Sequence, residues 1–90
     1  MVSLHLTRHL VDGLRERGLE RGWVERVAQD PDWIEPSRAE VQLRFGRIDE
    51  AGGKILRVTT IDEAGVRVVI TAHFDRKATR EARRTDAPHL

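Results

Sequence analysis

The chain has 90 residues, of which 39% are hydrophobic and 34% charged, and it contains no cysteine. This length allows one small domain and excludes a multidomain enzyme. The absence of cysteine excludes disulfide frameworks and thiolate zinc sites, so we expect an apolar core to hold the fold.

Sixteen Lys and Arg residues against fifteen Asp and Glu residues leave a formal net charge of +1. No global field therefore draws the protein to nucleic acid or to a membrane. The longest uncharged apolar run, 68–72, is far too short to span a bilayer, and the N-terminus lacks the layout of a signal peptide. We expect a cytoplasmic protein with no membrane partner.

The first segment of the chain, residues 2–6, alternates apolar and polar residues as a short extended segment does. Thr7 is a suitable N-cap for the helix that follows, and Gly18 can end that helix in the left-handed conformation. The apolar stripe of this helix comprises Leu10, Val11 and Leu14.

A second helix is predicted over 20–29, with a poor N-cap and with Asp30-Pro31 as its stop. Its apolar side comprises Trp23, Val24, Val27 and Ala28. Residues 31–36 are predicted to run irregularly, with Trp33 and Ile34 covering the edge of the core.

Three strands are predicted over 41–48, 54–61 and 66–74, joined by two hairpin loops. Alternation assigns one apolar face to lie under the helices: Val41, Leu43, Phe45, Leu56, Val58, Thr60, Val66, Val68, Ile70, Ala72 and Phe74. The opposite face would be polar: Gln42, Arg44, Arg57, Thr59, Arg67, Thr71 and His73, with Ile55, Ile61 and Val69 among them. Alternation fails near Gly46, which predicts a β-bulge there.

The predicted architecture is an α+β domain in which two N-terminal helices pack on a three- to four-stranded antiparallel sheet. The domain would comprise residues 1–76. Residues 77–90 form a basic segment that we expect to be a flexible tail.

The predicted polar sheet face is suited to an anion, because the three strand spans hold five basic residues and no acid. Matching apolar faces sets Arg57 opposite Val69 or Thr71, so Arg57 neighbours Thr71 directly or diagonally, with His73 one step further. Arg44 and Arg67 are further candidates for phosphate binding. An ordinary solvated sheet face is the alternative interpretation.

Several enzyme classes are excluded, because the chain has no GxSxG elbow, no glycine-rich phosphate loop and no carboxylate pairs outside turns. We therefore expect neither a protease, a kinase nor a dehydrogenase, and no cofactor. His5 and His9 are four residues apart, but no HExxH context accompanies them, so we expect no metal site.

Five short segments together resemble a known family: 7–9 (Thr-Arg-His), 15–19 (Arg-Glu-Arg-Gly-Leu), 30–33 (Asp-Pro-Asp-Trp), 56–58 (Leu-Arg-Val) and 69–76 (Val-Ile-Thr-Ala-His-Phe-Asp-Arg). In their order and spacing the chain resembles the small bacterial proteins grouped as domain of unknown function 4258, over most of its length. That family resembles the RelE/ParE-like plasmid toxins and the barnase-like ribonuclease fold, in which helices precede and cover an antiparallel sheet.

The resemblance implies a metal-independent ribonuclease, with RNA as substrate and a cognate antitoxin as partner. The matching positions would make His9 the base, Arg57 the phosphate clamp, Thr71 a positioning donor and His73 the acid. Arg17 would supplement them in binding phosphate.

A second function stays open beside the ribonuclease. The same polar face could belong to a non-catalytic module that binds an anion, a nucleic acid or another protein. A homodimer through the strand 41–48, taken as an edge of the sheet, is a third possibility.

Overall fold

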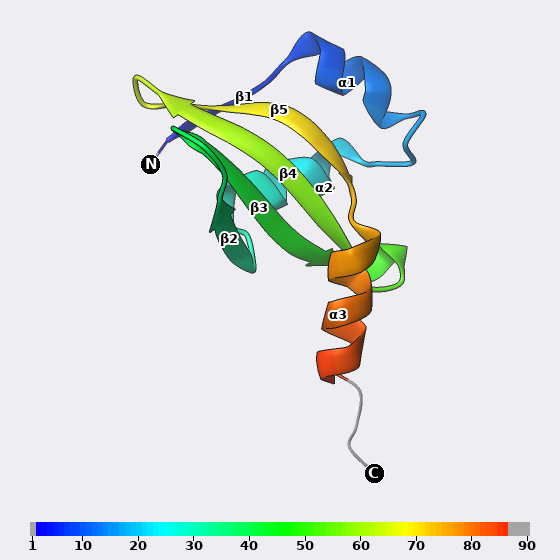
Figure 1. Cartoon of the computed structure of the whole chain (residues 1–90). Helices are drawn as coiled ribbons and strands as arrows, with labels where there is room; N and C mark the ends of the chain where they lie inside the picture. Colours follow the sequence, from blue (N-terminus) through cyan, green and yellow to red (C-terminus); the bar gives the residue numbers. More distant parts are fainter. Residues whose placement is uncertain (1, 87–90) are drawn as a thin grey trace.

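The protein is an α+β domain built on one five-stranded sheet, shown by a computed structural model that describes residues 2–86 (Figure 1). The strands are β1 (Ser3–Leu6), β2 (Trp33–Pro36), β3 (Val41–Ile48), β4 (Lys54–Glu63) and β5 (Val66–Phe74). The helices are α1 (Arg8–Leu14), α2 (Arg21–Gln29) and α3 (Arg76–Asp86), with a short 3-10 turn at Asp49–Ala51. None of the described helices is both long enough and apolar enough to cross a bilayer.

The first two helices begin and end as the local sequence predicts. The Thr7 hydroxyl accepts a hydrogen bond from the backbone N–H of Leu10, and Gly18 adopts a φ of +66° after α1. No side chain caps α2, as its sequence predicts. Both helices bury their apolar stripes on one face of the sheet, which we call the helix face; the other is the open face.

The sheet is mixed and has five strands, where three or four antiparallel strands were predicted; β1 lies in the segment 2–6 that was predicted to be extended. Its order is β1-β5-β4-β3-β2, with β1 parallel to β5 and the other pairs antiparallel. The segment expected to be irregular contains β2, because Trp33–Pro36 pairs with β3. The prediction that 41–48 is an edge strand is therefore wrong, since β3 has a neighbour on each side.

The predicted faces hold for part of β4 and β5 and are wrong elsewhere. β4 and β5 place Leu56, Val58, Ala72 and Phe74 on the helix face, as predicted. The bulge occurs between Thr59 and Thr60, where β5 carries the extra residue Ile70, and not at Gly46. It moves Arg67 and Val69 to the helix face and Val66 and Val68 to the open face.

β3 is inverted relative to the prediction. Its register with β4 is continuous from Val41 to Ile48, so Arg44 lies opposite Val58 on the helix face and Phe45 lies opposite Arg57 on the open face. A continuous register leaves no bulge to reverse the alternation, which places the apolar residues Val41 and Leu43 on the open face.

The C-terminal segment is helical from Arg76 to Asp86, where a flexible tail was expected. Asp75 caps this helix through a hydrogen bond from the Ala78 backbone N–H. Thr79 is buried, and its hydroxyl accepts a hydrogen bond from the Ile55 backbone N–H of β4 at 2.9 Å. These contacts attach the first turn of α3 to the end of the sheet (Figure 1), and residues 87–90 lie outside the described part.

Candidate functional site

One row of side chains crosses the open face on four adjacent strands. Trp33 lies opposite Phe45, Phe45 opposite Arg57, and Arg57 opposite His73. Directly opposed residues project from the same face of a sheet. We call these four residues the Trp33–His73 row; it sets two aromatic rings, a guanidinium and an imidazole side by side.

Arg57 and His73 form a close pair at the centre of the site. Nη2 of Arg57 lies 2.7 Å from Nε2 of His73. A guanidinium only donates hydrogen bonds, so Nε2 must be the acceptor. The imidazole is therefore neutral in this arrangement, with its proton on Nδ1.

The electrostatics of His73 agree with the neutral form. Burial lowers the pKa of His73 below its ordinary value, and the charges of Arg57 and Arg17 lower it further, while Asp75 acts in the opposite direction. The imidazole is thus held unprotonated near neutral pH.

This lowered pKa predicts that His73 makes the fold less stable in mild acid. The unfolded chain takes up the proton below pH of about 6.5, whereas folded His73 does so only at lower pH. Stability contributed by the neutral ring is therefore present above about pH 6.5 and is lost as the pH falls toward the folded pKa. Urea unfolding at pH 7.5 and pH 5.5 should show a smaller pH difference in His73→Gln than in the wild type. An unchanged difference in the variant would contradict this role of His73.

Asp75 is a member of the site that the sequence did not reveal as one. Its Oδ2 lies 3.6 Å from Nη1 of Arg57, and its Oδ1 accepts the hydrogen bond that caps α3. An acidic residue just before a helical segment is a recognisable cap signal, but here the helix itself was not expected. Asp75 links Arg57 to the start of α3 and partly neutralises the guanidinium.

A buried donor of Arg57 remains without a protein acceptor. Among the described residues, nothing accepts a hydrogen bond from its Nε, although that atom is buried. Arg57 also lines a hollow of about 270 Å³, whose walls include Trp33, Phe45 and Asp75. Buried donors are normally hydrogen-bonded, so this site has unused capacity for an acceptor.

The polar residues predicted to lie near Arg57 do so. Thr59 pairs directly with Thr71, two positions from the Arg57–His73 pair and on the same face. Thr71 is thus a diagonal neighbour of Arg57, as predicted, although the residue directly opposite Arg57 is His73 and not Val69 or Thr71.

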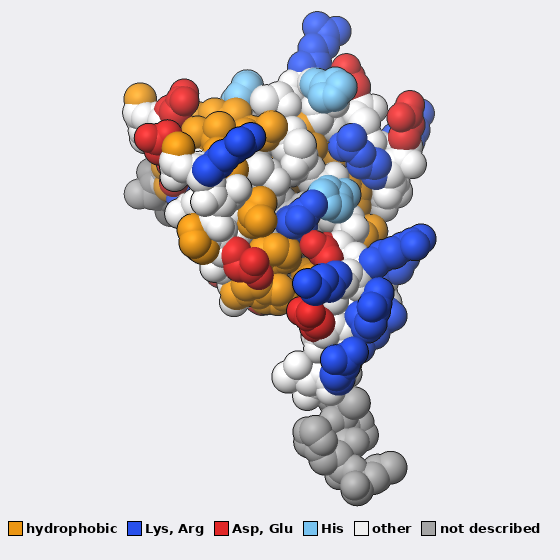
Figure 2. Space-filling view, in the orientation of Figure 1, with side chains coloured by type: hydrophobic (Ala, Val, Ile, Leu, Met, Phe, Trp, Pro, Cys, Tyr) orange, Lys and Arg blue, Asp and Glu red, His pale blue; other side chains and the backbone are white. Residues whose placement is uncertain are grey.

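His9 and Arg17 come from the segment that contains α1. Both side chains are exposed. Arg17 lies near enough to His73 to affect its pKa. Figure 2 views the open face and shows histidine side chains over α1 and β5 with Lys and Arg side chains around them. Within residues 2–86, however, His9 makes no hydrogen bond or ion pair that would join it to the Trp33–His73 row.

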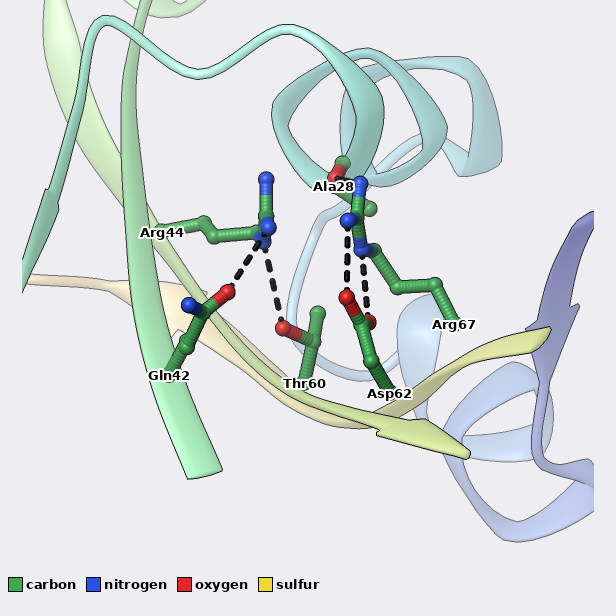
Figure 3. Close-up of polar contacts among 6 residues, drawn as sticks. All are labelled: Ala28, Gln42, Arg44, Thr60, Asp62 and Arg67. Atoms are coloured by element: carbon green, nitrogen blue, oxygen red, sulfur yellow. Dashed lines mark hydrogen bonds and ion pairs between the residues drawn. The ribbon is translucent and has the colours of Figure 1, made fainter. Parts of the chain in front are cut away.

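Arg44 and Arg67 lie on the helix face, opposite to their predicted position (Figure 3). Arg44 is buried and donates from Nε to the Thr60 hydroxyl at 3.2 Å and from Nη2 to Oε1 of Gln42 at 2.8 Å. Burial lowers the pKa of Arg44, and the nearby charge of Arg67 lowers it further.

Arg67 holds together the end of α2 and the tip of the last hairpin. Nε and Nη2 of Arg67 donate to the two carboxylate oxygens of Asp62 at 2.8 and 2.9 Å. Nη1 donates to the Ala28 carbonyl near the end of α2 at 3.3 Å. The hydrogen bond from Arg67 lowers the pKa of Asp62, and the same bond raises the pKa of Arg67. Both guanidinium groups are therefore occupied by internal contacts.

The aromatic half of the row was not predicted. Trp33 and Phe45 stack with ring centroids 4.9 Å apart and an interplanar angle of 4°. The sequence gives no sign of this contact, because it depends on the pairing of β2 with β3.

Within the described residues, no three His, Asp or Glu side chains come together in a group that could hold a metal ion. Comparison of the chain with family models, with curated proteins and with solved structures gives no match.

Proposed function

We propose that the protein binds single-stranded RNA across the open face of its sheet, with a phosphate at Arg57 and a base against Trp33. The observation that carries the proposal is the Trp33–His73 row, which sets an aromatic wall beside a guanidinium that has an unused buried donor. Aromatic stacking combined with cationic contacts to the backbone is the usual way to bind a single strand.

Arg57 is suited to a phosphodiester. Its Nε has no acceptor within residues 2–86, and its ion pair with Asp75 is long at 3.6 Å. A phosphate oxygen could accept from Nε while a second oxygen accepts from a terminal nitrogen, the two-pronged geometry that arginine favours. The Nδ1 proton of neutral His73 offers a further donor beside it.

Trp33 supplies the surface for a base. Its ring is partly exposed, lines the hollow next to Arg57 and is supported by the buried ring of Phe45. A hydrogen bond of 3.1 Å from its Nε1 to Oε2 of Glu35 fixes the orientation of the indole. A ring held in place in this way loses little freedom when a base packs against it.

The neighbouring hydroxyls favour RNA over DNA. Thr59 and Thr71 form a cross-strand pair two positions from the Arg57–His73 pair, and the Thr71 side chain is exposed. A hydroxyl both donates and accepts hydrogen bonds, as does the ribose 2′-hydroxyl that distinguishes RNA.

Binding of a fluorescent oligouridine, measured by anisotropy, tests this function. We expect Arg57→Ala and Trp33→Ala each to weaken binding by about tenfold, since a stacked base contributes about 1–3 kcal/mol. Arg21→Ala is the control for loss of one arginine charge: it removes an exposed arginine from the α2 side of the molecule, where Arg21 pairs with Glu25. The control should bind within about twofold of the wild type, and the DNA oligomer of the same sequence should bind more weakly. Equal losses in all three variants would show non-specific attraction and overturn the proposal.

RNA cleavage without a metal is a second candidate, and the neutral His73 favours it. When a phosphate engages Arg57, Nε2 of His73 loses its donor and can accept the proton of a 2′-hydroxyl. The 2′-oxygen would then attack phosphorus as the bond from phosphorus to the 5′-oxygen breaks, with Arg57 stabilising the charge on the phosphoryl oxygens.

The lowered pKa of His73 suits a base better than the acid that the resemblance to the RelE/ParE-like toxins implies. His9 would then be the group that protonates the leaving 5′-oxygen. Incubation of total RNA with the protein in EDTA should release fragments ending in 2′,3′-cyclic phosphate, and His73→Ala should abolish their release. RNA that stays intact with the wild-type protein would leave binding alone as the function.

A further inference from the structure

A second polar site lies where α3 leaves the sheet, away from the Trp33–His73 row. A pocket of about 440 Å³ is lined by Lys54, Phe74, Arg76, Thr79, Arg80 and Arg83. Four of these six residues carry a positive charge and none is acidic. Phe74 packs against Trp23 of α2, so the pocket adjoins the helix face.

The cations come from two elements that the fold brings together. Arg76, Arg80 and Arg83 are spaced by four and three residues and so share one side of α3. Lys54 begins β4, and its Nζ lies 5.3 Å from the centre of the Phe74 ring. Figure 2 shows Lys and Arg side chains following α3 away from the body of the protein.

Among the described residues, no ion pair neutralises the charges of this pocket. The ion pairs found within residues 2–86 involve other cations, and Arg83 donates instead to the Gly52 carbonyl at 3.0 Å. Glu81 of α3 lies on a different side of the helix, where it lines the hollow beside Arg57. Like charges held close together repel, so this arrangement favours binding of an anion.

We infer that this pocket binds the phosphate groups of a ligand that carries at least two of them, such as a pyrophosphate group or successive phosphates of a nucleic acid strand. The positive charge of the four cations around this pocket exceeds the negative charge of a single carboxylate or sulfate. Arginine forks and a lysine are the side chains that phosphate oxygens bind best. Thr79 only positions the site, because its hydroxyl is occupied by Ile55 N–H and by the Asp75 carbonyl.

The pocket does not depend on RNA binding by the Trp33–His73 row, and its variants separate the two. Arg80→Ala removes one cation that lines the pocket. Arg84→Ala removes the same charge from the same helix at an exposed position outside the pocket. Alanine is the best helix former, so neither substitution is expected to unfold α3.

Calorimetric titration with pyrophosphate at constant ionic strength tests the inference. We expect saturable binding that weakens by about tenfold in Arg80→Ala, because the variant loses a charge-assisted hydrogen bond to the phosphate. Arg84→Ala should stay within about twofold of the wild type. The absence of saturable pyrophosphate binding, or equal losses in Arg80→Ala and Arg84→Ala, would overturn it.

The oligouridine distinguishes the two sources of phosphate. If the pocket receives a nucleic acid strand, pyrophosphate competes with oligouridine for binding. Arg80→Ala then lowers the affinity for both ligands. If it receives a free diphosphate group, the oligomer binds Arg80→Ala as it binds the wild type. Either result supports the inferred phosphate pocket. If Arg57→Ala leaves the affinity for oligouridine unchanged, that result contradicts only the RNA site proposed at the Trp33–His73 row.

Discussion

Replacing Gly46 with valine is expected to lower the free energy of unfolding by about 3 kcal/mol. Gly46 lies on the helix face of β3, directly under α2. A Cβ at this position would lie 2.6 Å from Cγ2 of Val27 and 3.4 Å from Nη2 of Arg26. That Arg26 nitrogen donates to the Arg47 carbonyl and ties α2 to β3 at the same point. The side chain of valine therefore has no room unless α2 moves off the sheet.

Urea unfolding followed by circular dichroism measures the effect. Gly22→Ala, on α2, is the control, because a Cβ there meets no heavy atom within 4 Å. That change should raise stability by about 0.5–1 kcal/mol, since glycine is unfavourable inside a helix. Combining Gly46→Val with Val27→Ala should cost less than the sum of the two single changes, because the second makes space for the first. A Gly46→Val variant as stable as the wild type would show that α2 does not approach β3 so closely.

The same glycine shows where local sequence stops being informative. The bounds of β3 and β5 coincide with the predicted spans, and Thr7 caps α1 as predicted. These features rest on turn and cap residues that act on their immediate neighbours. The role of Gly46 depends on a helix about twenty residues away in the sequence, and alternation alone assigned it to a bulge.

The faces of the sheet were harder to predict than its strands. The bulge that places Arg67 beside Asp62 lies between Thr59 and Thr60, opposite the consecutive apolar residues 68–70, and that run does not show which residue is the extra one. A shift of one residue reverses every side chain beyond it. Arg57, Thr71 and His73 lie on the near side of the bulge, which is why their common face could be predicted.

The aromatic part of the site depends on a strand with little intrinsic preference for one. β2 has only four residues, ends in Pro36 and gains its hydrogen bonds only when β3 is present. Short strands of this kind form through pairing and not through propensity. Trp33 could therefore be identified as an apolar covering residue, but its stacking on Phe45 and its place beside Arg57 could not be predicted.

Replacing Thr79 with valine is expected to lower the free energy of unfolding by about 2 kcal/mol, because valine keeps the shape of threonine and removes its hydroxyl. That hydroxyl accepts from the Ile55 backbone N–H and donates to the Asp75 carbonyl at 2.7 Å. The Ile55 N–H is buried with it, so the variant leaves a donor without water or a partner. The same loss loosens α3, and pyrophosphate binding at Arg76 and Arg80 should weaken along with stability.

Thr85→Val is the matched control for this change. The Thr85 hydroxyl makes the equivalent bond to the carbonyl four residues earlier, that of Glu81 at 2.9 Å, but the residue is exposed. Its loss should change stability by no more than about 0.5 kcal/mol. Differential scanning calorimetry of both variants gives the contribution of the buried Thr79 hydroxyl. Both variants replace threonine with valine in the same helix, so the change in helix propensity is the same in each. Equal melting temperatures for the two variants would mean that Thr79 does not anchor α3 to β4, and the cationic side of that helix would then lack the fixed geometry from which its phosphate pocket is inferred.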